Sequence, residues 1–200
     1  MVARYRSVRI DMGTGDGRAV LAAAAADAQR LVIGVDANAA GMAESSRRAL
    51  RPRGGLPNVL FVAAAAENLP PELDGIADEV TVNFPWGSLL RGLLTGDAAV
   101  LNGLSRIMKP GAALDILLSV TERDGLPGLP AIEDAATVAD LIAPYADHGL
   151  AVTGIRALEP ADIAAAGSSW GKRLGAGGRR RAWRISALRV DTAVCARLSG

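Results

Sequence analysis

The chain has 200 residues, half of them hydrophobic but only 4% aromatic, and a formal net charge of +1. This length suits one domain, which we expect to span residues 1–200 with a core of Ala, Val, Leu and Ile. The single cysteine, Cys195, excludes an intramolecular disulfide and fits a reducing cytoplasm. No apolar segment approaches the roughly 20 residues that a membrane span needs, and residues 1–9 contain no signal-peptide core. We therefore expect a cytoplasmic protein that does not enter a membrane.

Predicted strands and helices alternate along the whole chain. The strands are predicted at 8–12, 31–36, 58–63, 79–84, 112–121, 150–158 and 182–190. The helices are predicted at 18–29, 39–51, 97–108, 133–147 and 160–166. Pro and Gly at 51–57 and 108–112 predict turns that close the preceding helices. This alternation predicts an α/β fold, with a mainly parallel sheet covered on both faces.

The first predicted strand leads into a glycine-rich turn, in the sequence VRIDMGTGDGR at 8–18. Glycine allows positive φ and a close approach of the backbone to a ligand, and the following helix directs free N–H groups over the turn. A dinucleotide fingerprint needs a third glycine at position 18, which is Arg18. The spacing is G-x-G-x-G, with Asp11 ahead of the first glycine, as in many S-adenosylmethionine (SAM) methyltransferases.

Acidic and aromatic residues follow the next strands, at the edge where open α/β sheets bind ligands. Asp36 ends the second strand, where an acid accepts the two ribose hydroxyls, although it could instead be a helix N-cap. Glu67 could accept from an adenine amino group or a ribose, or act as the N-terminal anion of a short helix. Trp86 follows the fourth strand, either beside the methyl donor or as a buried structural residue. With Trp170, on a glycine-rich basic loop at 167–181, it predicts a slot for a planar base.

Charge is unevenly distributed along the chain. Residues 1–66 and 163–200 carry formal charges of +4 and +7, whereas residues 67–162 carry −10. The basic residues form two clusters: Arg47, Arg48, Arg51 and Arg53, then Lys172, Arg173, Arg179, Arg180, Arg181 and Arg184. Each could be a solvated face, but two Arg-rich clusters beside a SAM-like turn favour a nucleic-acid substrate.

The motifs IDMGTGDGR, GLPNVLFVAAAAENLP, NFPWGSLL and SSWGKRL together resemble one family. This is the family of 16S rRNA adenine-1408 N1-methyltransferases, which confer resistance to kanamycin and apramycin. The resemblance extends from about Arg9 to Ile185. It implies a seven-stranded class I methyltransferase fold with an antiparallel last strand, which uses SAM and acts on the 30S subunit. We expect a monomer that needs no metal ion and releases S-adenosyl-L-homocysteine.

The resemblance also assigns roles to individual residues. The SAM pocket would be lined by Gly13, Asp36, Ala66, Glu67 and Ser88, with Asp11 supporting the turn, and we add Gly15 and Asn83 from the same turn and strand end. Trp86 and Trp170 would stack on the flipped adenine, and Ser168 would steady the loop of Trp170. The family's rRNA contacts would correspond to Arg47, Arg48, Arg51, Arg53, Lys172, Arg173, Arg179 and Arg180.

Two alternatives remain open. The run from Asn83 to Trp86 is similar to the N-P-P-Y/F signature of exocyclic-amine methyltransferases, which would yield N6-methyladenine or a methylated amide. The chain could also be a weakly active or non-catalytic SAM and RNA binder. The family usually has a hairpin before the first strand and a longer, basic segment where this chain has TERDGLP at 121–127. We expect these differences to weaken binding to the ribosome while leaving the SAM pocket intact.

Overall fold

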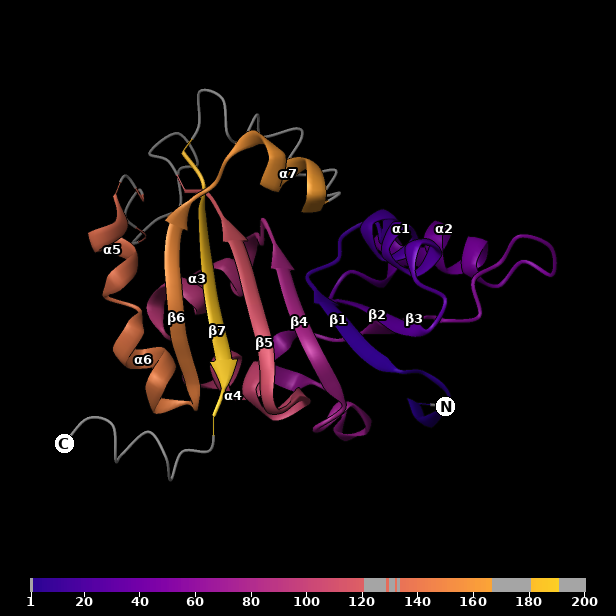
Figure 1. Ribbon diagram of the computed structural model, residues 1–200, viewed down its shortest axis with the longest axis horizontal. Helices are drawn as coiled ribbons and strands as arrows, with labels where there is room; N and C mark the ends of the chain where they lie inside the picture. The colour runs from indigo at the N-terminus through magenta and orange to yellow at the C-terminus, as the bar shows by residue number, and fades with distance from the viewer. Residues whose placement is uncertain (1, 121–128, 130–131, 133, 167–180, 191–200) are drawn as a thin grey trace.

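A computed structural model describes residues 2–120, 129, 132, 134–166 and 181–190 (Figure 1). Its strands are β1 (Ser7–Met12), β2 (Arg30–Asp36), β3 (Val59–Ala63), β4 (Ala77–Asn83), β5 (Met108–Leu118), β6 (Leu150–Ala157) and β7 (Trp183–Arg189). Its α-helices are α1 (Arg18–Ala26), α2 (Ala39–Ala49), α3 (Gly87–Thr95), α4 (Ala98–Ile107), α5 (Ala135–Ala139), α6 (Ile142–Asp147) and α7 (Pro160–Ala166). Short 3-10 helices are η1 (Val2–Arg4), η2 (Ala66–Asn68) and η3 (Pro71–Leu73). None of the described helices is long and apolar enough to cross a lipid bilayer.

The strands form one sheet in the order β3-β2-β1-β4-β5-β7-β6. Strands β1 to β5 pair in parallel, whereas β7 lies between β5 and β6 and is antiparallel to both. The predicted mainly parallel sheet with an antiparallel last strand is therefore confirmed. The strand order reverses between β1 and β4, and such a switch point opens a crevice at the carboxyl ends of the strands.

The main core lies between the sheet and a layer formed by α3, α4 and α6. Ile10 of β1, Val80 of β4 and Ile116 of β5 point to this side of the sheet and are fully buried there. Leu104 of α4 is also fully buried, and the Tyr145 hydroxyl of α6 donates to the carbonyl of Leu93 in α3 at 3.3 Å. Burial raises the pKa of Tyr145 well above its usual range, so this hydroxyl stays protonated.

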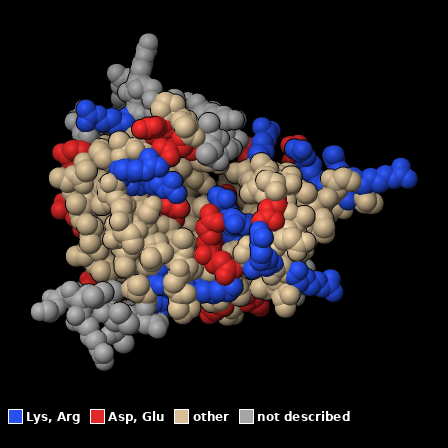
Figure 2. All heavy atoms as spheres, in the orientation of Figure 1, with Lys and Arg blue, Asp and Glu red and all other residues tan. Residues whose placement is uncertain are grey.

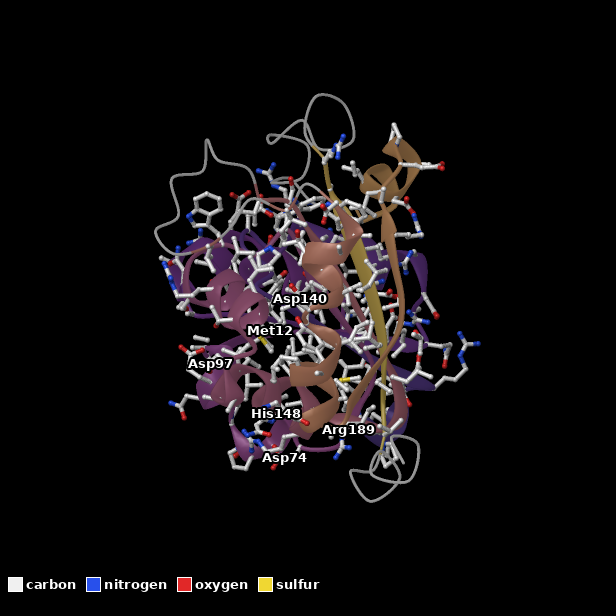
Figure 3. All side chains as sticks on the ribbon, turned by 90° about the vertical axis from the view of Figure 1, so that its left-hand side faces the viewer. Met12, Asp74, Asp97, Asp140, His148 and Arg189 are labelled. Atoms are coloured by element: carbon white, nitrogen blue, oxygen red, sulfur yellow. The ribbon has the colours of Figure 1, made fainter. Side chains whose placement is uncertain are left out.

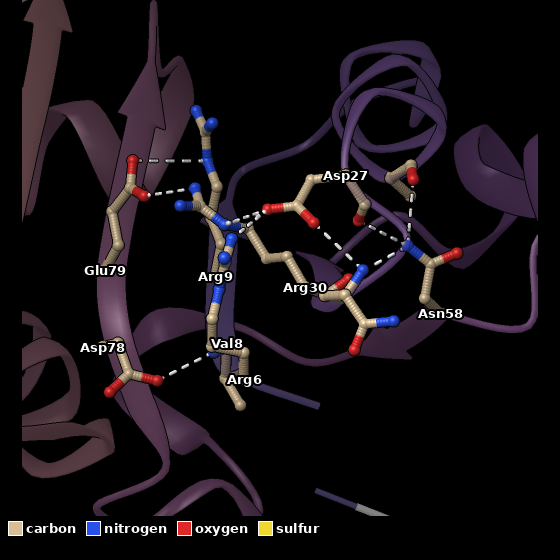
Figure 4. Close-up of polar contacts among 10 residues, drawn as sticks. Arg6, Val8, Arg9, Asp27, Arg30, Asn58, Asp78 and Glu79 are labelled. Atoms are coloured by element: carbon tan, nitrogen blue, oxygen red, sulfur yellow. Dashed lines mark hydrogen bonds and ion pairs between the residues drawn. The ribbon is translucent and has the colours of Figure 1, made fainter. Parts of the chain in front are cut away.

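The opposite face of the sheet is covered unevenly. Helices α1 and α2 pack beside β2 and β3, but among the described helices only α7 lies near the exposed face of β4, β5 and β7, at one end (Figure 1). The prediction of a sheet covered on both faces is wrong for this part. Polar side chains explain the difference, since they pair across the strands. Glu79 bonds Arg30 at 2.8 Å and lies 3.6 Å from Arg9 (Figure 4), and Asp115 binds Arg184 at 2.7 and 2.8 Å.

One helix is missing from the predicted elements, and two predicted elements are wrong. Helix α3 was not predicted, because Gly87 and Gly92 interrupt its apolar periodicity. The predicted turn at 108–112 is the beginning of β5, where the register with β4 shifts between Ala77 and Glu79 and the chain bulges. The helix predicted at 133–147 is divided into α5 and α6, because Pro144 lacks the N–H needed to continue it.

Candidate active site

The glycine turn lies between β1 and α1, at the centre of the sheet. Gly13, Gly15 and Gly17 all have positive φ, of 72°, 60° and 72°. The N–H groups of Gly13 and Thr14 donate to the carbonyl of Val35 at 2.8 and 3.1 Å, which ties the turn to β2. A Cβ atom at Gly13 would lie 2.8 Å from Cδ2 of Leu89. The turn therefore requires glycine chiefly for its conformation, and at Gly13 a side chain would also displace Leu89.

Asp36 fastens the end of β2 to this turn. Its Oδ2 accepts from the N–H of Gly15, and its Oδ1 from that of Asn38, both at 2.8 Å. The N-cap of α2 is Asn38, whose side chain accepts from Gly41 at 3.3 Å, so the N-cap interpretation of Asp36 is wrong. Each carboxylate oxygen keeps a further lone pair, which can accept from a ligand hydroxyl.

A second carboxylate, Asp11, is only 5% exposed. Its Oδ1 accepts from the hydroxyl of Thr81 and from Nδ2 of Asn83, both at 2.9 Å. Burial raises the pKa of Asp11, although these hydrogen bonds act in the opposite direction. Thr81 pairs with Asp11 in the register of β1 and β4. Sequence reasoning missed Thr81, because nothing in the sequence indicates which residue of a distant strand faces an acid.

The NFPWG segment connects β4 to α3 and has an unusual backbone. Phe84 has a φ of 52° and is the only non-glycine residue with positive φ in the described part of the chain. Its N–H donates to Leu117 at 2.7 Å, and its buried ring packs against Leu117 and Ile163. These contacts maintain a conformation that costs on the order of 1–3 kcal/mol. Trp86, at the N-terminus of α3, is 46% exposed, so the alternative of a buried structural tryptophan is wrong.

These segments surround one cavity of about 590 Å³. Its wall includes every residue predicted for the SAM pocket, together with the predicted stacking residue of NFPWG: Asp11, Gly13, Gly15, Asp36, Ala66, Glu67, Asn83, Ser88 and Trp86. Thr14, Asn38 and Leu89 also line it. The cavity follows the carboxyl ends of β3, β2, β1 and β4, so it can hold an elongated ligand with hydroxyl or amino groups near the carboxylates.

Other predicted residues lie away from this cavity or outside the described residues. Arg47, Arg48, Arg51 and Arg53 are exposed on α2 and the following turn, at the end of the molecule where Figure 2 shows basic side chains gathered. Trp170, Ser168, Lys172, Arg173, Arg179, Arg180 and the segment 121–127 lie outside the described residues.

The described residues contain no group of three or more His, Cys, Asp or Glu side chains that could hold a metal ion. The single histidine, His148, follows α6, and its Nδ1 is 2.9 Å from Oδ1 of Asn102 (Figure 3). It does not line the cavity, whereas Met12, at the end of β1, does. The described wall of the cavity carries carboxylate, amide and aromatic side chains, among them Asp36, Asn83 and Trp86.

A seven-stranded sheet of this order, a glycine turn and an acid ending β2 define a SAM-dependent methyltransferase. The family described as 16S rRNA (adenine(1408)-N(1))-methyltransferase matches residues 1–189. The chain belongs to this family, which confirms the predicted resemblance.

Individual relatives support the same assignment. The 16S rRNA (adenine(1408)-N(1))-methyltransferase of Streptoalloteichus tenebrarius is 38% identical over 180 residues, which cover 86% of this chain and 82% of that relative. A crystal structure of a tryptophan-to-alanine mutant of the corresponding enzyme from Catenulisporales acidiphilia, with the cosubstrate SAM, has a TM-score of 0.86 and 37% identity, covering 95% of this chain and 88% of that chain. The aminoglycoside resistance methyltransferase NpmB1 has a TM-score of 0.78 and 41% identity, covering 94% and 90%.

Proposed function

We propose that this chain transfers the methyl group of SAM to N1 of adenine 1408 in the 16S rRNA of the 30S subunit, and thereby confers aminoglycoside resistance. One observation carries the proposal: a single cavity joins the carboxylates of a nucleoside-binding edge to an exposed tryptophan on NFPWG, in a chain of this family. Relatives named as methyltransferases favour an enzyme over the alternative of a weakly active or non-catalytic SAM and RNA binder.

The residues of the cavity fit SAM at each of its polar groups. The carboxylates of Asp36 and Glu67 suit the ribose hydroxyls and the adenine amino group, and Asp11 suits the ammonium group of the methionine part. Ser88 lies in the first turn of α3, where a hydroxyl and free backbone N–H groups suit a carboxylate. The glycine turn allows the backbone to approach the ligand closely.

The proposed reaction needs no general base. Bound SAM supplies an electrophilic methyl group on a sulfonium. The N1 lone pair of a neutral adenine forms the new N–C bond while the C–S bond breaks and sulfur keeps the electron pair. The products are S-adenosyl-L-homocysteine and a cationic N1-methyladenine. The protein therefore has to extrude the base, align N1 with the methyl group and exclude water.

Stacking and phosphate contacts would supply the binding energy. Extruding the base costs a few kcal/mol, and stacking returns about 1–3 kcal/mol per base. Trp86 would form one side of the slot, and we place Trp170, supported by Ser168, on the other. Indole faces also favour the developing positive charge on the base. Two sets of basic residues would hold the rRNA: Arg47, Arg48, Arg51 and Arg53, with Lys172, Arg173, Arg179 and Arg180. We further propose that the protein acts as a monomer in the cytoplasm, where the 30S subunit is found.

A methyl-transfer assay on purified 30S subunits tests the proposal. With SAM present, reverse transcription should stop at adenine 1408, because a methyl group on N1 blocks the Watson–Crick edge. Trp86→Ala should lose roughly 5- to 150-fold in rate, as expected from about 1–3 kcal/mol of stacking. Trp183→Phe, in β7 and outside the cavity wall, is the matched control and should keep its activity.

The same assay separates the alternatives. SAM binding without any methyl transfer would identify a non-catalytic binder. A labelled adenine that is read through by reverse transcriptase would identify N6-methyladenine, and with it the exocyclic-amine reaction.

A further inference from the structure

The side-chain amide of Asn83 contacts the buried carboxylate of Asp11 through its nitrogen. Its Nδ2 donates to Oδ1 of Asp11 at 2.9 Å, and the hydroxyl of Thr81 donates to the same oxygen at 2.9 Å. The amide nitrogen is the donor in this pair, so it faces Asp11. The amide is planar, and Oδ1 of Asn83 therefore points away from Asp11. No hydrogen bond within the described part of the chain reaches this Oδ1.

This Oδ1 belongs to a residue on the wall of the cavity that we propose holds SAM. Asn83 ends β4 and lines the SAM cavity, and it also lines a second hollow of about 440 Å³ bounded by α1 and Ala166. The buried ring and constrained backbone of Phe84 connect Asn83 to the loop that carries Trp86. The amide oxygen and the exposed indole are thus presented from one rigid segment beside the same cavity.

The chemistry of the base matches such an acceptor. In adenine, the N1 lone pair is flanked by an exocyclic amino group, which donates, whereas guanine carries an acceptor oxygen at that position. Methylation at N1 places a positive charge on the ring, which the amino group shares. The amino group then becomes a stronger donor, and a hydrogen bond from it strengthens as the transition state forms.

We propose that Oδ1 of Asn83 accepts a hydrogen bond from the exocyclic amino group of the target adenine. This contact would select adenine over guanine and align N1, rather than the amino nitrogen, with the methyl group. The inference rests on the proposed function and adds a base-recognition residue to it. In the alternative exocyclic-amine reaction, this amide oxygen would accept a hydrogen bond from the amino group that is itself methylated. In the present proposal, the same oxygen only recognises the amino group, and N1 is methylated.

The experiment compares two proteins on two substrates at saturating SAM. The substrates are 30S subunits reconstituted with adenine or with unsubstituted purine at position 1408, and the measurement is kcat/KM for incorporation of labelled methyl. Asn83→Ala should lose at least tenfold on adenine and less than threefold on purine, because purine has no amino group to recognise. Thr81→Val is the matched control, since it removes the other donor to Asp11. It should lower kcat/KM by the same factor on both substrates.

Two further measurements separate recognition from damage to the site. Calorimetry should give similar losses of SAM affinity for Asn83→Ala and Thr81→Val, because both remove a donor from Asp11. Asn83→Ser, which keeps a polar side chain at the strand end, should lose the preference for adenine as Asn83→Ala does. Thermal melting identifies any variant that fails to fold.

Equal losses on adenine and purine for both Asn83 variants would overturn the proposal, since Asn83 would then act only through Asp11. If the unchanged protein methylates purine as fast as adenine, the amino group is not recognised and the proposal also fails. A different result marks failure of the proposed function itself: no methyl transfer by the unchanged protein to adenine-bearing subunits, which removes the basis of the inference.

Discussion

At the scale of single residues, two carboxylates beside the cavity, Asp11 and Asp36, have structural contacts as well as a proposed ligand. Asp36 accepts from the backbone of Gly15 and Asn38, so it shapes the glycine turn before any ligand binds. Asp11 is a buried residue of β1, and its carboxylate accepts hydrogen bonds from Thr81 and Asn83 of β4. Substitutions at these positions should therefore change both ligand affinity and stability, and the two effects need separate measurements.

Asp36→Ala should weaken SAM binding by about 1–3 kcal/mol, because it removes a charged acceptor. Calorimetry on the folded variant measures this loss. Asp97→Ala is the matched control: Asp97 also accepts from two backbone N–H groups, those of Ala99 and Val100, but does not line the cavity. It should lower the melting temperature without changing SAM affinity. An unchanged SAM affinity in Asp36→Ala would contradict the assignment of the pocket.

Asp11→Asn should change how stability depends on pH. Burial raises the pKa of Asp11 above 3.8, so the folded state holds this proton more tightly than the unfolded state. The free energy of unfolding of the unliganded protein should therefore fall as pH rises from 3.8 through the higher folded pKa. Asp11→Asn lacks this loss and should gain stability relative to the unchanged protein over that interval. Denaturant titrations across the pH range measure the difference, and parallel curves would refute the prediction.

At the scale of elements, α4 supports the part of the cavity that carries Glu67. Gly103 of α4 lies so close to η2 that a Cβ atom there would be 1.9 Å from the carbonyl oxygen of Ala66. Replacing glycine by alanine inside a helix normally stabilises it by about 1 kcal/mol. Here the backbone of η2 would have to move, and Ala66 and Glu67 would move with it.

Gly103→Ala should therefore destabilise the protein by about 1–3 kcal/mol, the usual cost of overpacking, and should lower SAM affinity as well. Denaturant unfolding and calorimetry measure the two effects. Gly154→Ala in β6 is the control, because a Cβ atom there meets nothing within 4 Å, and both quantities should stay nearly unchanged. A Gly103→Ala protein with a higher free energy of unfolding would contradict the prediction, since it would show that η2 moves aside without destabilising the fold.

At the scale of the whole molecule, two surfaces carry basic residues, and they differ in whether those residues form ion pairs. Arg47, Arg48, Arg51 and Arg53 project from the end formed by α2 and its following turn, and no ion pair joins them to an acid within the described residues (Figure 2). The polar face of the sheet is different, because its basic residues are paired with carboxylates (Figure 4). Unpaired arginines on an exposed end are suited to phosphate contacts.

Replacing Arg47, Arg48, Arg51 and Arg53 with Glu should abolish binding to 30S subunits while SAM affinity stays nearly constant. In single variants such as Arg51→Glu, the lost phosphate contact should also flatten the dependence of affinity on salt. Lys109→Glu is the single-charge control, because Lys109 pairs with Asp78 at the amino ends of the strands, away from the cavity. Filter binding over a range of salt concentrations measures both. Unaltered 30S affinity in the quadruple variant would mean that this cluster is only a solvated face.

The sequence by itself determined the alternation of strands and helices, the glycine turn and the family. These depend on local periodicity, on the conformations open to glycine, and on motifs such as NFPWGSLL that are contiguous in the chain. It also predicted that Asp11 and Asp36 lie at the ends of strands and that Glu67 follows one, and the parallel sheet brings such strand ends to one edge.

Only the tertiary structure decided which partners those residues have. The pairing of Asp11 with Thr81 and Asn83 depends on the register between strands about 70 residues apart in the chain. The contact of Gly103 with η2 and the positive φ of Phe84 likewise arise from packing between distant segments. Local propensity carries no information on such contacts, because they stabilise the protein only once distant strands and helices have packed together.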